Sequence, residues 1–148
     1  MKIRLYFLFI LALFFFSHSF SQVTKIPQSA KDNFARQYPA AQKANWDNDV
    51  VNVNVRFELN GEKMNAEYNN KGIWRKTEKS WAFDKLPEAV KDGFNKSKYA
   101  DRGVVETVIV YLPGDVEQYR LKVEKNDLQK KYLFFNQEGR LVRDAITL

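Results

Sequence analysis

The stretch Lys25-Ile-Pro-Gln-Ser-Ala-Lys-Asp-Asn-Phe34 returns sixty residues later as Lys85-Leu-Pro-Glu-Ala-Val-Lys-Asp-Gly-Phe94, and this repeat decides the fold. Five of the ten positions are identical. In each copy a proline precedes apolar residues at helical spacing, and a run rich in strand-forming residues follows. The repeat therefore predicts one helix-then-strands unit of about sixty residues that the chain uses twice.

The first unit carries the clearest strand signal. From Val51 to Leu59, apolar and polar residues alternate, which is typical of a strand with one buried face. Asn60-Gly61 follows and predicts a two-residue hairpin turn, because both residues tolerate positive φ. This turn sets a register whose pairs fall on one face of the sheet: Phe57 with Met64, Val55 with Ala66, and Val53 with Tyr68.

Each unit ends in a similar turn, Tyr68-Asn-Asn-Lys-Gly72 and Phe135-Asn-Gln-Glu-Gly139, and residues 77–84 would join the units. Short turns between successive strands favour antiparallel pairing. We predict an α+β fold of two tandem repeats, residues 22–80 and 81–148, each one helix packed on an antiparallel sheet of about four strands. A half of this size would be marginal alone, so the repeats should share a core or a continuous sheet.

Residues 1–21 have the pattern of a secretory signal peptide. A charged start precedes the apolar run from Leu5 to Phe16, and Ser19-Phe-Ser21 supplies small residues before a cut at Gln22. The alternative, a membrane anchor, would have to cross about 30 Å of hydrocarbon with twelve apolar residues that rise about 1.5 Å each. We therefore predict a periplasmic or secreted mature chain without a membrane span.

The composition excludes several kinds of chemistry. The chain has no cysteine, and its one histidine, His18, lies in the predicted signal peptide. Catalysis by a Ser-His-Asp triad or a Cys-His pair is therefore excluded from the mature chain. Zinc sites built on cysteine and histidine are excluded for the same reason. Asp47-Asn48-Asp49 resembles the start of a calcium loop, but Val51 and Asn52 stand where an oxygen ligand and a glycine are needed, which favours a plain turn. We predict no enzymatic activity, catalytic residue, metal or cofactor.

The charge balance argues against nucleic acid as a partner. Without the signal peptide, 22 basic residues face 18 acidic ones, a net charge of +4. The basic residues are scattered among acidic ones, whereas nucleic-acid binding normally needs a concentrated basic stripe.

The run Tyr132-Leu-Phe-Phe135 places large side chains on both faces of one strand. Aligning the two glycine turns puts Leu133 and Phe135 on the helix-facing side, so Tyr132 and Phe134 should point the other way. The opposite face is either covered from within the chain or forms an exposed aromatic patch that binds a partner. We predict Tyr132 and Phe134 as partner-binding residues, with Trp46 as a further member of the patch.

The sequence also resembles the PepSY-like, β-lactamase-inhibitor-like domain family. The resemblance rests on Ile26-Pro27, Phe34, Tyr38-Pro39, Trp46, the hydrophobic-Asn-x-x-Gly turn, Tyr119-Arg-Leu-Lys-Val123 and Phe134-Phe-Asn-Gln-Glu-Gly-Arg-Leu-Val142. It implies an exported protein of a Gram-negative bacterium with two helix-on-sheet units. In the related inhibitor proteins the sheets form a concave surface that grips an enzyme, but this chain lacks their disulfides.

These features predict an exported, non-catalytic binding module that uses the sheet face opposite the helices. An inhibitor-like domain for a peptidase or another hydrolase is one form of it, and the partner would be an envelope or exported protein or peptide. The alternative is a structural or assembly protein of the cell envelope with no discrete ligand. A large apolar patch on the helix-free face would favour the binding module, and an evenly polar face the structural protein.

Overall fold

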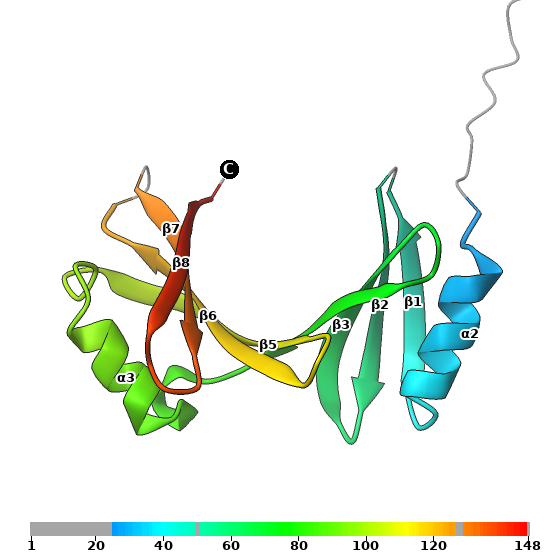
Figure 1. The fold of residues 1–148 in the computed structure, drawn as a ribbon, viewed down its shortest axis with the longest axis horizontal. Coiled ribbons are helices and arrows are strands. Elements are labelled where there is room, and N and C mark those ends of the chain that lie inside the picture. The colour runs from blue at the N-terminus through cyan, green and yellow to red at the C-terminus, as the bar shows by residue number, and fades with distance from the viewer. Residues whose placement is uncertain (1–24, 50, 127–128, 148) are drawn as a thin grey trace, which may run out of the picture.

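The strands of the protein pair in chain order into one antiparallel sheet (Figure 1). The computed structural model describes residues 25–49, 51–126 and 129–147. The strands are β1 Gln42–Asn48, β2 Asn52–Leu59, β3 Glu62–Asn69, β4 Trp74–Ser80, β5 Gly103–Leu112, β6 Val116–Glu124, β7 Lys130–Asn136 and β8 Leu141–Ile146. The helices are α2 Gln28–Gln37, the short 3-10 helix η2 Phe83–Lys85, and α3 Glu88–Asn95.

Helices α2 and α3 begin directly after a proline. Pro27 and Pro87 are the N-cap residues of α2 and α3, where the missing proline N–H leaves no donor unsatisfied. Each helix turns one apolar stripe toward the sheet, formed by Ala30 and Phe34 in α2 and by Val90 and Phe94 in α3. Helices this short are not stable alone in water, so their packing on the sheet keeps them folded.

The prediction of two tandem units, each a helix on its own four-stranded sheet, is wrong. β4 pairs with β5 from Thr77 opposite Tyr111 to Ser80 opposite Val108, so all eight strands form one sheet. The physical reason is that β4 continues to Ser80, into the segment expected to be a linker. Unpaired there, its backbone N–H and C=O groups would form an open sheet edge. The division into two repeats at residues 80 and 81 stays a prediction.

The β2–β3 hairpin has the predicted register. Its pairs include Phe57 opposite Met64, Val55 opposite Ala66, and Val53 opposite Tyr68. Asn60 and Gly61 form the turn with φ of 53° and 80°, as a two-residue hairpin loop of this kind requires.

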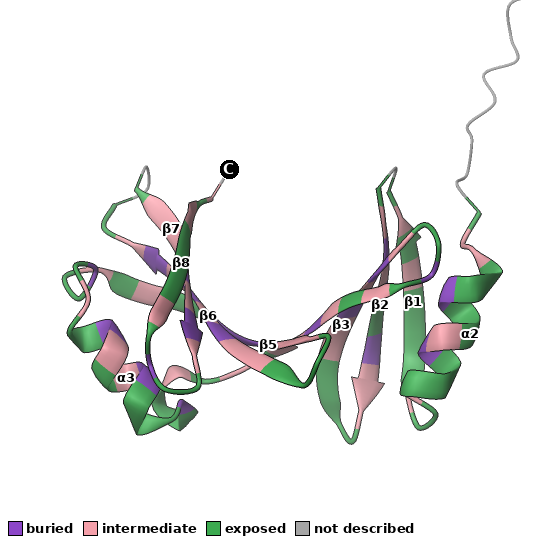
Figure 2. Ribbon diagram, viewed as in Figure 1, coloured by how far each residue is buried: buried purple, intermediate pink, exposed green. Residues whose placement is uncertain are grey.

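Buried side chains gather into two clusters, one beneath each helix (Figure 2). The first contains Ala30, Phe34, Val53, Val55, Phe57, Ala66 and Tyr68. The second contains Leu86, Val90, Phe94, Tyr99, Ile109, Tyr119, Leu121, Val123, Leu133 and Phe135. One continuous sheet therefore carries two separate cores, both on the side that the helices cover.

Glycine turns lie directly against both helices. An added Cβ at Gly72 would clash with the backbone of α2 at Ala30, and one at Gly139 would clash with the carbonyl oxygen of Ala89 in α3. Both glycines have positive φ, 79° and 78°, and each donates its N–H to the carbonyl of the asparagine three residues earlier. Each of α2 and α3 is therefore contacted by one glycine turn of the sheet.

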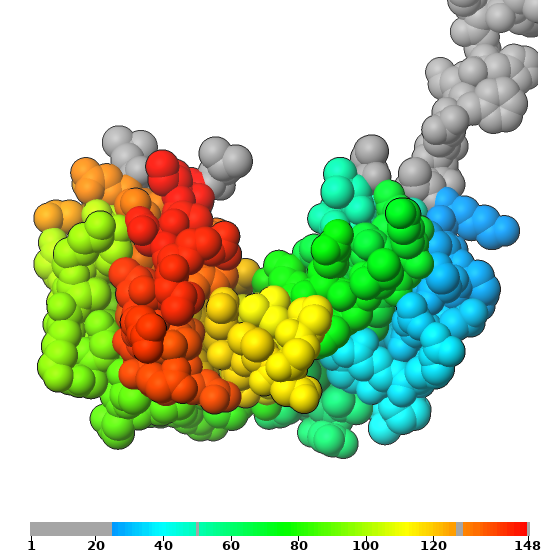
Figure 3. Space-filling view, viewed as in Figure 1, coloured from blue at the N-terminus to red at the C-terminus, as the bar shows by residue number. Residues whose placement is uncertain are grey.

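The helices leave the other side of the sheet uncovered. α2 and α3 lie on the outside of the two ends of the curved sheet, and the helix-free side between the ends is concave (Figure 1). The space-filling view shows the molecule hollowed there (Figure 3). In the part of the chain that the structure describes, no helix has the length and apolar character needed to cross a membrane. The predicted signal peptide lies outside the described residues.

Candidate functional site

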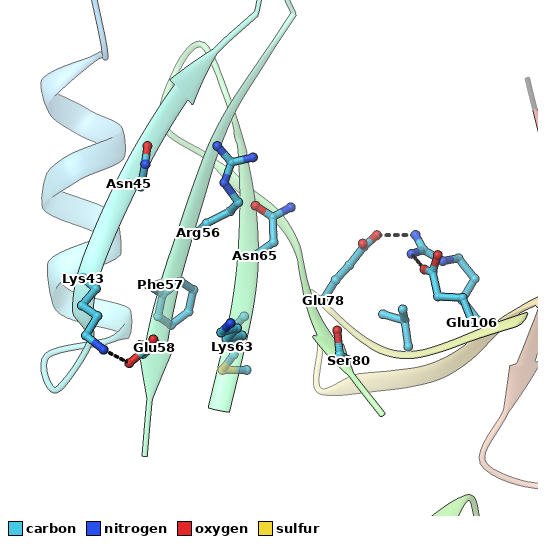
Figure 4. A pocket seen from close by; sticks show the side chains of 13 residues that line it. Lys43, Asn45, Arg56, Phe57, Glu58, Lys63, Asn65, Glu78, Ser80 and Glu106 are labelled. Atoms are coloured by element: carbon cyan, nitrogen blue, oxygen red, sulfur yellow. Dashed lines mark hydrogen bonds and ion pairs between the residues drawn. The ribbon is translucent and has the colours of Figure 1, made fainter. Parts of the chain in front are cut away.

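The concave side contains a hollow of about 420 Å³, shown from close by in Figure 4. Successive residues of a strand point to opposite faces of its sheet, so alternate residues of β1 to β6 reach this side. The polar lining includes Asn45, Arg56, Asn65, Glu78, Glu106 and Arg120. The hollow therefore presents charged and amide groups, which can bind polar groups of another molecule.

Arg120 occupies the centre of the concave side. Its Nη1 donates to Oε1 of Glu78 and its Nη2 to Oε1 of Glu106, both at 2.8 Å (Figure 4). The three residues come from the neighbouring strands β6, β4 and β5. Only 15% of the Arg120 side chain is exposed, and its buried Nε has no hydrogen-bond partner among the described residues. The cluster fixes the guanidinium firmly at the floor of the concave side.

The wall formed by β1 to β3 carries less constrained polar groups. Lys43 and Glu58 form an ion pair of 2.8 Å. Arg56 lies opposite both Asn45 and Asn65 in neighbouring strands, and these side chains line the hollow (Figure 4). Arg56 is exposed, so this wall offers a guanidinium to the solvent.

Tyr132 and Phe134 lie on the helix-free side, as their alternation with the buried Leu133 and Phe135 requires. Both are half-buried. The guanidinium carbon of Arg120 lies 4.9 Å from the ring centroid of Tyr132, and that of Arg143 lies 3.9 Å from the centroid of Phe134. The two rings are therefore covered in part by cations and do not form a bare aromatic patch.

Trp46 lies on the other side of the sheet. Its ring packs edge-on against Phe34 of α2, with centroids 5.3 Å apart and an interplanar angle of 77°. Opposite Trp46 in β2 is Val55, which is fully buried beneath the helix. The structure thus brings Tyr132 and Phe134 together and places Trp46 in the packing around the first core.

Sequence reasoning missed the charged residues of the hollow, chiefly Arg120, Glu78 and Arg56. One signal was present, because the alternation in Tyr119-Arg-Leu-Lys-Val123 puts Arg120 on the opposite face from the apolar residues. The contact with Glu78 had no local signal, since it depends on the long-range pairing of β4 with β5.

The concave side is not a large apolar patch. Large exposed apolar side chains of the described residues are Val51, Ile73, Val105, Val116, Val142 and Ile146, and none of these lines the hollow. The side combines charged residues over β1 to β6 with two aromatic rings on β7.

Asp49 forms a turn, in agreement with the interpretation of the Asp47-Asn48-Asp49 segment. Its Oδ1 accepts hydrogen bonds from the backbone N–H groups of Val51 at 3.0 Å and Asn52 at 2.7 Å. These bonds favour the charged carboxylate and hold the pKa of Asp49 below its usual range. Within the described ranges, no three acidic, histidine or cysteine side chains lie close enough together to hold a metal ion.

A second polar cluster lies on the helix side, away from the hollow. Oδ2 of Asp144 accepts from the Tyr99 hydroxyl at 2.6 Å and from Nζ of Lys131 at 2.9 Å. These two donors lower the pKa of Asp144 to about 2. The cluster links the segment after α3 to β7 and β8, so its role is structural.

Residues 50–143 match the family model described as "Putative beta-lactamase-inhibitor-like, PepSY-like". The chain therefore belongs to this PepSY-like family. No curated protein matches the chain.

Three solved structures have a similar fold. A protein of Bacteroides ovatus described as a DUF2874 family protein is 26% identical, with 82% of this chain and 88% of that chain covered and a TM-score of 0.74. A BLIP-like protein of Bacteroides fragilis is 23% identical, with coverage of 83% and 87% and a TM-score of 0.73. A protein of Bacteroides eggerthii described as a "putative periplasmic" protein is 23% identical, with coverage of 82% and 89% and a TM-score of 0.71.

Proposed function

We propose that this protein is an exported, non-catalytic module that binds another exported or envelope protein on the concave side of its sheet. The observation that carries the proposal is the uncovered hollow of about 420 Å³. Both helices pack on the other side (Figure 1), so the hollow is open to a partner. Concave sites with a few well-placed polar groups are where proteins commonly bind ligands.

The family supports binding without catalysis. Its description refers to inhibitors of an enzyme, and a similar structure is described as BLIP-like. An inhibitor acts by occupying its target, so it needs a complementary surface and no reacting groups. In the hollow, Glu78 and Glu106 both form ion pairs with Arg120, so both carboxylates are already engaged within the chain.

Export is part of the proposal. The pattern of residues 1–21 predicts a signal peptide, and one structure of the same fold is described as a "putative periplasmic" protein. The partner would then be a protein of the same compartment.

Tyr132 and Phe134 are proposed as contact residues at the β7 end of the surface. They lie on the helix-free side beside Arg120 and Arg143, where a partner that enters the hollow would reach them. Trp46 is left out of the surface because it packs against Phe34 on the helix side.

A structural protein of the envelope without a discrete ligand is the second candidate. The polar character of the concave side over β1 to β4 favours it, since that region offers little apolar area to a partner. The concave side is nevertheless unevenly built, with a fixed arginine in the hollow and two aromatic rings on β7. This arrangement favours binding of a specific partner.

A cross-linking experiment tests the proposal. The chain has no cysteine, so Asn65→Cys places a single photo-cross-linker in the hollow, and Ala35→Cys places the same reagent on the exposed side of α2. We expect a defined envelope protein to cross-link to position 65 and not to position 35, with identification by mass spectrometry. Equal labelling from both positions, or none from position 65, would contradict a binding role for the hollow.

A further inference from the structure

Every glutamate that lines the hollow is held by a basic side chain of the same protein. Glu58 pairs with Lys43 at 2.8 Å. Glu78 and Glu106 both pair with Arg120. These acidic groups are neutralised internally, so they offer little free negative charge to an incoming molecule.

The concave side carries more basic residues than these ion pairs use. Arg56 and Lys63 line the hollow on β2 and β3, and neither has an ion-pair partner among the described residues. Lys122 on β6 and Arg143 on β8 are likewise without an ion-pair partner in the described chain. Among the described carboxylates of this side, Asp47 at the β1 edge is the one without an ion-pair partner.

These cations stand on both walls of the concavity. β2 and β3 form one wall, and β6 and β8 belong to the other (Figure 1). Arg56 and Lys63 line the hollow on one wall. Lys122 and Arg143 lie opposite Tyr132 and Phe134 in neighbouring strands, so they stand on the helix-free side of the other wall. A group that enters between the walls meets uncompensated positive charge from two directions.

The aromatic rings position the cations of the β6–β8 wall. The guanidinium of Arg143 lies 3.9 Å from the centroid of Phe134, and Nζ of Lys122 lies 5.8 Å from that of Tyr132. A guanidinium over a ring keeps its N–H donors in its own plane, where they can still bind a carboxylate with two parallel bonds. The rings thus present cations that are already ordered.

We propose that the concave side receives an acidic segment of the partner protein, whose carboxylates reach the unpaired cations of both walls. This inference rests on the proposed binding function and specifies the chemistry of the partner. Complementary charge steers two proteins together and fixes their orientation, whereas a basic or purely apolar segment would leave these cations unmatched. Mutual repulsion and solvation keep an acidic loop extended, so it can enter a hollow whose lining carries charged and amide groups.

The test uses short poly-L-glutamate as the probe and two double variants of equal charge. Arg56→Glu with Arg143→Glu reverses one cation on each wall, while Lys31→Glu with Lys71→Glu reverses two exposed cations on α2 and in the β3–β4 turn. We expect the first double variant to bind the probe at least about tenfold more weakly than the parent, and the second less than about twofold more weakly. Circular dichroism would verify that both variants are folded.

Three outcomes would overturn the inference. The first is an equal loss of affinity in the two double variants, which would mean attraction to net charge alone. The second is binding of poly-L-glutamine as tight as that of poly-L-glutamate. The third is equally tight binding of a DNA oligonucleotide of matched charge. The cross-linking experiment separates this inference from the proposed function. A partner that cross-links to position 65 through a segment without acidic residues would retain the binding role and reject the acidic ligand.

Discussion

Glu78 on β4 and Arg120 on β6 meet across the intervening strand β5, with 2.8 Å between Oε1 and Nη1. Glu78 belongs to the half of the sheet formed by β1 to β4 and Arg120 to the half formed by β5 to β8. Their side chains are only 16% and 15% exposed, so solvent screens this pair less than a surface ion pair. The contact joins the two halves in addition to the backbone pairing of β4 with β5.

Replacing Arg120 should therefore weaken the whole sheet. Arg120→Gln removes two charge-assisted hydrogen bonds and leaves Glu106 without its partner, so we expect a loss of about 1–3 kcal/mol in the free energy of unfolding. Urea unfolding followed by tryptophan fluorescence would measure it. The matched variant Lys125→Gln breaks an ion pair whose side chains are both 55% exposed and should cost less than about 1 kcal/mol. Similar costs in the two variants would contradict this account.

Gly139 should tolerate no side chain. Gly139→Ala adds a Cβ that clashes with the carbonyl oxygen of Ala89, on a backbone with φ of 78°. Gly114 has a similar φ of 81°, but nothing lies within 4 Å of its added Cβ. We expect Gly114→Ala to cost about 1–2 kcal/mol from backbone strain alone and Gly139→Ala to cost clearly more. Equal urea midpoints would show that the turn moves away from α3 freely.

Phe34 and Phe94 should each be essential to one core. They are 7% and 5% exposed and belong to different clusters, so truncation to alanine should cost roughly 3–5 kcal/mol in either case. Ile146→Ala, at a position 74% exposed, is the control and should change the free energy of unfolding by less than about 1 kcal/mol. A melting temperature barely altered by Phe94→Ala would refute the packing described for α3.

Truncation of Tyr132 and Phe134 should weaken partner binding, whereas truncation of Trp46 should lower stability alone. The double variant Tyr132→Ala with Phe134→Ala should remain folded, at a cost of about 1–2 kcal/mol for the lost cation–ring contacts, and should lower the cross-linking yield at position 65. Trp46→Ala should cost about 2–3 kcal/mol through lost packing on Phe34 and leave the yield unchanged. Unfolding of the double variant would place these rings in the core. An unchanged yield in a folded double variant would remove them from the surface.

Asp144 should make stability depend on acidic pH. Its folded-state pKa of about 2 lies below the value of about 4 expected for an unfolded chain. The bonds from Tyr99 and Lys131 therefore stabilise the fold fully above about pH 4, and this stabilisation is lost as the pH falls toward about 2. Asp144→Asn should flatten the pH dependence of the urea midpoint in that window, and Tyr99→Phe should flatten it in part. An unchanged slope in Asp144→Asn would contradict the assignment.

Local signals in the sequence predicted the local structure. The Asn60-Gly61 turn fixed the register of β2 on β3 because a two-residue loop admits only one pairing. The two glycine turns were predicted to correspond, and both have positive φ and contact a helix. In each case the information lies within a few consecutive residues.

A shared core or continuous sheet was expected from the small size of each half, but the register that joins the two halves could not be predicted. The residues of β4 that pair with β5, Thr77 to Ser80, are separated from it in the chain by η2 and α3. No single turn sets their register, and both strands could equally have ended as edges. The contact of Arg120 with Glu78 follows from this pairing and was hidden for the same reason.

The orientation of the β7 side chains agrees with the prediction because the register of β7 on β6 preserves the alternation. Glu124 lies opposite Lys130 and Lys122 opposite Tyr132, which keeps Tyr132 on the helix-free side. The side of Trp46 depends instead on the register of β1, which contains an irregularity between Gln42 and Asn45. No turn residue in the sequence fixes such an irregularity.

The pairing of β4 with β5 over only four residues makes the protein prone to strand exchange between molecules. If that pairing opens while each core stays folded, β5 exposes an edge that carries Val108, Ile109 and Val110 in succession, all buried in the closed sheet. This open edge of β5 is paired most readily by β4 of another molecule, since β4 already fits β5 in register. Transient opening at high concentration would therefore lead to strand-exchanged dimers, in which each half keeps its own core and takes its neighbour from a second chain.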